Sequence, residues 1–153
     1  MSDEGADPEA GPWVTVRLGS IRPDPRPPSS FGHDEPDLDA RLRAAPERVR
    51  RAALALAVRA VTTRFRFGDD ELVRQAVEAV ERGLTLAEET RSRIGHLRAQ
   101  GTDLRTCSSA VHALYAATGK GVAAVEALNA VRYAVADDWP VLRRELYRLV
   151  REG

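Results

Sequence analysis

The pattern of apolar and polar residues changes at about residue 36, and apolar side chains then recur every three or four positions. This is the period of a helix with one buried face. Long helices are expected over residues 46–65, 69–82, 85–100, 102–118, 121–138 and 138–150, and a short one over residues 38–44. The connections are short, so the sequence predicts an all-α fold. We expect a compact bundle of five or six helices, forming a single domain over residues 37–153.

The helix expected over residues 46–65 has the most distinctive pattern. Its middle is apolar around most of the circumference, and its polar side chains fall on one narrow stripe. A helix that is apolar on several sides is typically buried on several sides. We therefore predict that it is the central helix of the bundle.

Several helix ends carry local signals. Asp69 or Asp70 is suited to cap the N-terminus of the helix expected over residues 69–82, and Gly83 is suited to end it in a left-handed conformation. Thr85 and Glu88 have the spacing of a capping box. In the helix over residues 102–118, the periodicity places four side chains inward: Leu104, Cys107, Val111 and Leu114.

Residues 1–36 differ in composition from the rest of the chain. They contain seven of the nine prolines, and three arginines against seven acidic residues give them a net charge of −4. Such a segment buries too little apolar surface to offset the entropy of ordering, so a flexible or extended segment is expected. Residues 13–21, WVTVRLGSI, alternate like a half-buried strand. They are interpreted as an extended or disordered stretch, with an added strand on another protein's sheet or a local hairpin as alternatives.

The remaining residues carry a net charge of +4, almost entirely as arginine. Lys120 is the one lysine beside twenty-two arginines, a bias typical of a high-GC bacterial genome, which weakens any functional reading of arginine content. No apolar run approaches the roughly 20 residues of a membrane helix, and the N-terminus lacks the apolar core of a signal peptide. A cytoplasmic protein without membrane contact is therefore expected.

The sequence predicts no catalytic, cofactor-binding or metal-binding site. His33 lies in an acidic stretch that matches no calcium loop, and Cys107 reads as a small core residue. His96 and His112 are interpreted as helix-surface residues, although Ser108 precedes His112 by one turn. One enzyme or small-ligand hypothesis stays open, in which a pocket combines three side chains: His112, Arg132 and Tyr133.

The arginine stripe on residues 46–66 is the candidate partner-binding surface. It consists of Arg48, Arg51, Arg59 and Arg66. The leading interpretation is a solvated stripe paired with acidic residues of neighbouring helices. The alternatives are a surface for a protein partner and a surface for nucleic acid, which binds arginine-lined helix faces through its phosphates.

Part of the chain resembles a known family. The stretch DDELVRQAVEAVERG is followed by LTLAEE and then by the alanine-rich SSAVHALYAA and GVAAVEALNAVRYAVA. Over about residues 53–136, this order is similar to that of small alanine-rich helical immunity proteins of bacterial polymorphic toxin systems. The resemblance implies a stoichiometric protein binder and assigns no role to any single residue.

These observations favour a non-catalytic protein-interaction module, immunity-like or regulatory, whose partner is another protein. The alternative is a nucleic-acid-associated accessory or regulatory protein that uses the arginine stripe. The oligomeric state is not predicted by any feature of the sequence.

Overall fold

The computed structural model describes residues 31–101, 103–120 and 122–152. It divides the chain into two units, Met1–Asp34 and Glu35–Gly153. The first unit contributes one short helix, α1 (Phe31–Asp34). The predicted extended stretch at residues 13–21 lies outside the described residues, as does most of the predicted flexible segment.

The second unit is all-α in the residues described, which confirms the predicted fold class. Its helices are α2 (Pro36–Ala44), α3 (Glu47–Arg64), α4 (Asp70–Arg82), α5 (Glu88–Gly95), α6 (Leu104–Ala117), α7 (Val122–Val135), the 3-10 helix η1 (Ala136–Asp138) and α8 (Trp139–Glu152). In its described residues this unit has seven α-helices; the predicted short helix is present as α2, and counting it gives one more than the predicted five or six.

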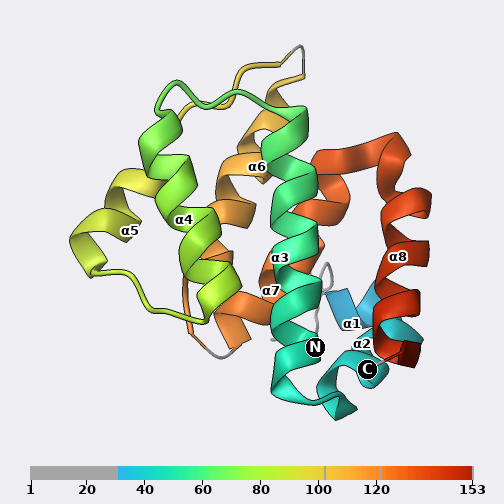
Figure 1. Cartoon of the computed structure of the whole chain (residues 1–153). Helices are drawn as coiled ribbons and strands as arrows, with labels where there is room; N and C mark the ends of the chain where they lie inside the picture. The colour runs from blue at the N-terminus through green and yellow to red at the C-terminus, as the bar shows by residue number, and fades with distance from the viewer. Residues whose placement is uncertain (1–30, 102, 121, 153) are drawn as a thin grey trace, which may run out of the picture. The chain divides into compact units, whose positions relative to one another are not determined.

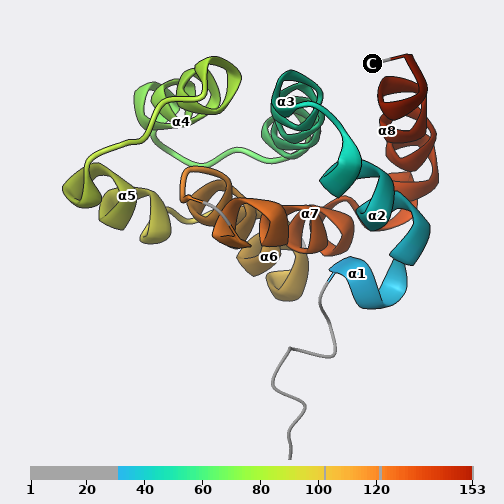
Figure 2. The ribbon, with the colours of Figure 1, turned by 90° about the horizontal axis from the view of Figure 1, so that it is seen from below.

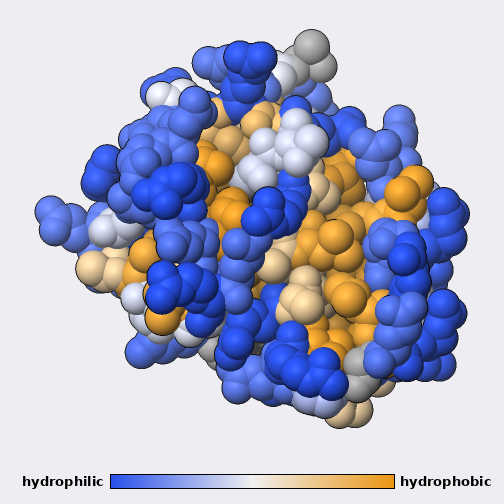
Figure 3. Space-filling model, in the orientation of Figure 1, coloured by the Kyte–Doolittle hydropathy of each residue, from blue (hydrophilic) through white to orange (hydrophobic). Residues whose placement is uncertain are grey.

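The helices of the second unit form two layers, and α3 lies in the middle of one of them. In Figures 1 and 2, α4, α3 and α8 lie in one layer, and α5, α6 and α7 lie in the other. Helix α3 contacts α2, α4, α6, α7 and α8, so it is the central helix, as predicted. Its burial is less complete than expected, because Ala52 is exposed and Leu56 is half-buried. Figure 3 accordingly shows apolar side chains gathered between α3 and α8 on this face.

Helices α6 and α7 pack together more extensively than any other pair in the described residues. Their buried positions are rich in alanine: Ala110, Ala113, Ala116 and Ala117 on α6, and Ala127, Ala130 and Ala134 on α7. Small side chains allow two helix backbones to approach closely, because little volume separates them. Leu114 completes this part of the core and is fully buried.

The ends of α4 match their sequence signals. The Asp69 carboxylate accepts a hydrogen bond from the Leu72 amide at 3.0 Å. Gly83 has a φ of 68°, and the Leu84 amide donates to the Ala79 carbonyl at 2.8 Å. This is the hydrogen bond that closes a left-handed helix end. Both predicted caps are confirmed.

The predicted capping box and the predicted length of α5 are wrong. Thr85 lies in extended chain, and α5 begins only after Ala87, whose side chain provides no capping hydrogen bond. The helix ends at Gly95 because the following residues leave the helical path to reach Arg66. There the Gln100 amide donates to the Arg66 carbonyl at 2.7 Å, in an isolated antiparallel bridge.

The carboxylates of Glu35 and Asp37 form hydrogen bonds that connect the start of this unit to α8. Glu35 accepts from the Trp139 indole N–H at 3.1 Å and from the Arg143 guanidinium at 2.8 Å. Asp37 accepts from the Tyr147 hydroxyl at 2.9 Å. These contacts join residues more than a hundred positions apart, so they hold the α2 end of the chain against its last helix.

Replacing Tyr147 by phenylalanine tests the Asp37 contact. The hydrogen bond from Tyr147, together with that from Arg41, lowers the pKa of Asp37 from its ordinary value of 3.8. A lowered folded-state pKa stabilises the fold above pH 3.8, and this contribution is lost as the pH falls through the lowered pKa. In the Tyr147→Phe variant, we expect the pKa of Asp37 to rise toward 3.8 and the acid-induced loss of stability to shrink.

The measurement is an NMR titration of the Asp37 carboxyl carbon, with urea unfolding between pH 2.5 and 6. The matched control is Tyr133→Phe, which removes the hydroxyl of an exposed tyrosine on α7. It should leave the titration of Asp37 unchanged. An Asp37 curve that is the same in both variants would show that the Tyr147 hydrogen bond is absent in solution.

Candidate functional site

The predicted arginine stripe lies on α3 and just beyond its end. Arg48, Arg59 and Arg66 are exposed, and Arg51 is half-buried. Arg59 forms an ion pair with Glu81 on α4, and Arg51 lies 3.3 Å from Glu47. The charges of Arg51 and Arg59 are therefore compensated by carboxylates of the same domain. The role of the stripe in partner binding stays a prediction.

Arg51 is also held by the backbone at the end of α4. A Cβ atom added to Gly83 would lie 2.6 Å from the Arg51 Nε. The guanidinium therefore lies directly against the glycine, in a space that any other side chain at position 83 would need. This contact gives Arg51 a packing role between α3 and α4.

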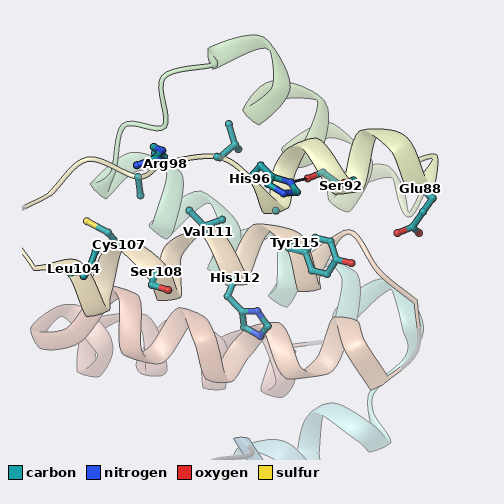
Figure 4. Close-up of a pocket in the computed structure, with 13 residues that line it drawn as sticks. Glu88, Ser92, His96, Arg98, Leu104, Cys107, Ser108, Val111, His112 and Tyr115 are labelled. Atoms are coloured by element: carbon teal, nitrogen blue, oxygen red, sulfur yellow. Dashed lines mark hydrogen bonds between the residues drawn. The ribbon is translucent and has the colours of Figure 1, made fainter.

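One concave surface of the described residues is a groove between α5 and α6, here called the α5–α6 groove (Figure 4). Its volume is about 780 Å³, within the range of ligand and peptide sites. Its apolar lining comes from Leu97, Ala99, Leu104, Val111 and Tyr115. Its polar lining comes from Glu88, Ser92, His96, Arg98, Ser108 and His112.

The two walls of the groove meet at its Tyr115 end. A Cβ atom added to Gly95 would lie 3.2 Å from Cδ1 of the Tyr115 ring, so α5 passes close to this ring. The Arg91 guanidinium lies over the same ring, 4.1 Å from its centroid, and donates to the Tyr115 carbonyl at 2.9 Å. Tyr115 therefore packs between α5 and α6 at this end of the groove.

Leu104 lies at the opposite end of the groove, and its predicted inward position is wrong. It is the first residue of α6, after the capping Asp103, and 85% of its surface is exposed. Cys107 and Leu114, placed inward by the same periodicity, are buried as predicted. A first helical residue lies beyond the part of α6 that α5 and α7 cover. Single exposed apolar residues are common on folded surfaces, so the exposure of Leu104 gains meaning only from the groove residues beside it.

The polar groups of the groove are not arranged as a catalytic centre. The Nδ1 atom of His96 lies 2.7 Å from the Ser92 carbonyl, which can only accept a hydrogen bond, so the neutral ring carries its proton on Nδ1. In Figure 4, Val111 points from α6 toward α5, whereas Ser108 and His112 point to the opposite side of α6. A hydroxyl nucleophile needs a base that is itself oriented by an acid. The groove residues do not form such a chain.

The three side chains of the small-ligand hypothesis are not brought together in this groove. His112 is among its lining residues, whereas Arg132 and Tyr133 are not. These two lie next to each other on α7, with the Arg132 guanidinium 4.7 Å from the centre of the Tyr133 ring. Within the described ranges, no group of three or more His, Cys, Asp or Glu side chains could hold a metal ion.

A second concave site is lined by residues of α3 and of its neighbouring helices. It has a volume of about 500 Å³ and is formed by α2, α3, the end of α4, the end of α6 and α7. Lys120 lies on its rim. Neither concave site was predicted from the sequence. The single lysine of the chain, Lys120, was a local signal for the second site.

The chain was compared with protein-family models, with curated proteins and with solved structures, and none of them matches it. In the part of the chain that is described, no helix is long and apolar enough to span a membrane. The resemblance to immunity proteins therefore stays a prediction.

Proposed function

We propose that this chain is a non-catalytic protein-binding module, immunity-like or regulatory, that holds its partner in the α5–α6 groove. The observation that carries the proposal is the exposure of Leu104 beside an apolar groove. Burying a leucine side chain stabilises a complex by about 1.5–3 kcal/mol relative to leaving it in water.

The charges around the groove indicate the chemistry of the partner. Arg98 lines the groove, is exposed, and forms no ion pair within the described residues. Arg105 follows Leu104 on α6 and is also exposed. Glu88 is the one carboxylate of the lining. We infer a partner segment with an apolar side chain for the groove and flanking carboxylates for these arginines. Complementary charge of this kind adds specificity and speeds association.

Replacing Leu104 by arginine should abolish partner binding without unfolding the protein. An arginine side chain at position 104 cannot enter a complementary apolar pocket of the partner. Because position 104 is exposed, the arginine does not disturb the packing of the core. The matched control is Val141→Arg, which changes an exposed apolar residue on α8 that does not line the groove. The measurement is affinity capture from host lysate with each purified variant, with and without nuclease, read by quantitative mass spectrometry.

We expect one protein in stoichiometric amount with the unmodified chain and with Val141→Arg, and at least about a tenfold loss with Leu104→Arg. Nuclease should not change this result. Equal capture by both variants would reject the groove as the docking site. Capture that disappears on nuclease treatment would instead favour nucleic acid on the arginine stripe, whose binding should then weaken linearly with the logarithm of salt concentration.

A further inference from the structure

We propose that the second concave site binds a small amphipathic anion, a molecule with an apolar body and one carboxylate or phosphate head group. We call this site the α3–α4 pocket. It shares no lining residue with the α5–α6 groove, so the proposal is independent of the proposed function.

The floor of the pocket is apolar and is built by several helices. It includes Leu42 of α2, Leu54 of α3, Val80 of α4 and Leu128 of α7. Leu42, Val80 and Leu128 are buried, so the floor is a rigid part of the core surface. A volume of about 500 Å³ is in the range of sites for small organic ligands, which are lined mainly by apolar side chains.

The rim carries more positive than negative charge. Arg43 lies 2.9 Å from Asp39, and Arg51 lies 3.3 Å from Glu47, so these two arginines are compensated within the protein. The remaining cations of the lining are Arg50 and Lys120.

Neither of these two cations forms an ion pair with a carboxylate of the described residues. Arg50 donates to the Ala45 carbonyl at the end of α2 and keeps its full charge. Lys120 is exposed and forms no ion pair with the described residues. The pocket therefore offers two positive charges above an apolar floor, which favours an anionic head group over a neutral or cationic one.

The identity of Lys120 supports this assignment. The chain has arginine at twenty-two positions, and its single lysine lies at the mouth of this pocket. An ammonium group is a compact charge on a flexible stem, whereas a guanidinium is a planar fork. The ammonium group of Lys120 can move with a small head group as the ligand enters the pocket. It also fits at a narrower pocket entrance than a guanidinium group would need.

The test is isothermal titration calorimetry of the whole chain with four probes that share one apolar body. The probes are decanoate, decyl phosphate, decanol and decylammonium, each used below the concentration at which it aggregates. We expect saturable binding of decanoate or decyl phosphate with one site, and at least about tenfold weaker binding of decanol and decylammonium, because a charge-assisted hydrogen bond is lost. The tighter of the two anions identifies the head group as carboxylate or phosphate.

Two variants locate the binding. Lys120→Gln should weaken binding of the anion about tenfold, and Arg144→Gln, which removes an exposed arginine of α8 outside the pocket, should leave it unchanged. Both positions are exposed, so both variants should fold. The proposal is overturned if no probe binds saturably, if decanol binds as tightly as the anions, or if Lys120→Gln and Arg144→Gln have equal effects.

Discussion

Replacing Leu114 by alanine should lower the free energy of unfolding by about 2–5 kcal/mol, whereas the same replacement at Leu104 should change it by less than about 0.5 kcal/mol. Both leucines lie on α6, and alanine has a helix propensity at least as high as that of leucine, so a loss of stability in either variant does not come from helix propensity. Leu114 is fully buried where α6 packs against its neighbours, and Leu104 is 85% exposed. The alanine at position 114 removes buried methyl groups and leaves a cavity. The alanine at position 104 removes atoms that already contact water.

Urea unfolding followed by circular dichroism at 222 nm measures both values under the same conditions. The comparison bears on function as well as on stability, since Leu104→Ala should lose partner binding while it keeps the stability of the unmodified chain. A large destabilisation by Leu104→Ala would show that this side chain belongs to the core. The proposed anchor of the α5–α6 groove would then be wrong.

Replacing Glu35 by alanine should cost about 2 kcal/mol of unfolding free energy. The side chain of Glu35 is only 13% exposed, and its two oxygens accept from Trp139 and from Arg143. The variant removes the acceptor that both groups share, and so loosens the attachment of α8 to the start of α2. Glu35→Gln keeps a carbonyl acceptor of similar shape, so it should cost about half as much.

Thermal unfolding of the two Glu35 variants, with Glu145→Ala as control, measures this contribution. Glu145 pairs with Arg148 on the same helix, and the carboxylate is more exposed, so its loss should cost no more than about 0.5 kcal/mol. Equal losses for Glu35→Ala and Glu145→Ala would mean that the Glu35 contacts are weak surface interactions.

The sequence was informative where structure depends on neighbouring residues. The cap at Asp69 and the left-handed end at Gly83 each use groups within a few positions, and both were predicted correctly. The capping box at Thr85 failed because the pattern gives only the spacing of two side chains. The path of the chain before α5 is set by packing, which holds Ala87 in an extended conformation.

The candidate site depends on contacts between distant segments, and periodicity does not contain these. His96 and Leu97 follow α5, whereas Cys107 and Val111 belong to α6, and the contacts of Gly95 and Arg91 with Tyr115 bring the two sets to one groove. The exposure of Leu104 could not be predicted from the spacing of apolar residues. This spacing gives the side of the helix on which a residue lies, but it does not give how far along α6 the neighbouring helices extend.

The attachment of α5 has a consequence for hydrogen exchange. Ile94 is the one buried side chain of this short helix, and the helix also contacts α6 through Arg91 and Gly95, which both lie against Tyr115. Segments with few buried contacts open at a lower free energy than the core, so the amides of α5 should exchange with solvent long before those of α6. The two walls of the groove thus differ in local stability. A bulky partner of the proposed kind can therefore enter the groove by displacing α5, while α6 and α7 remain packed together through their alanine residues.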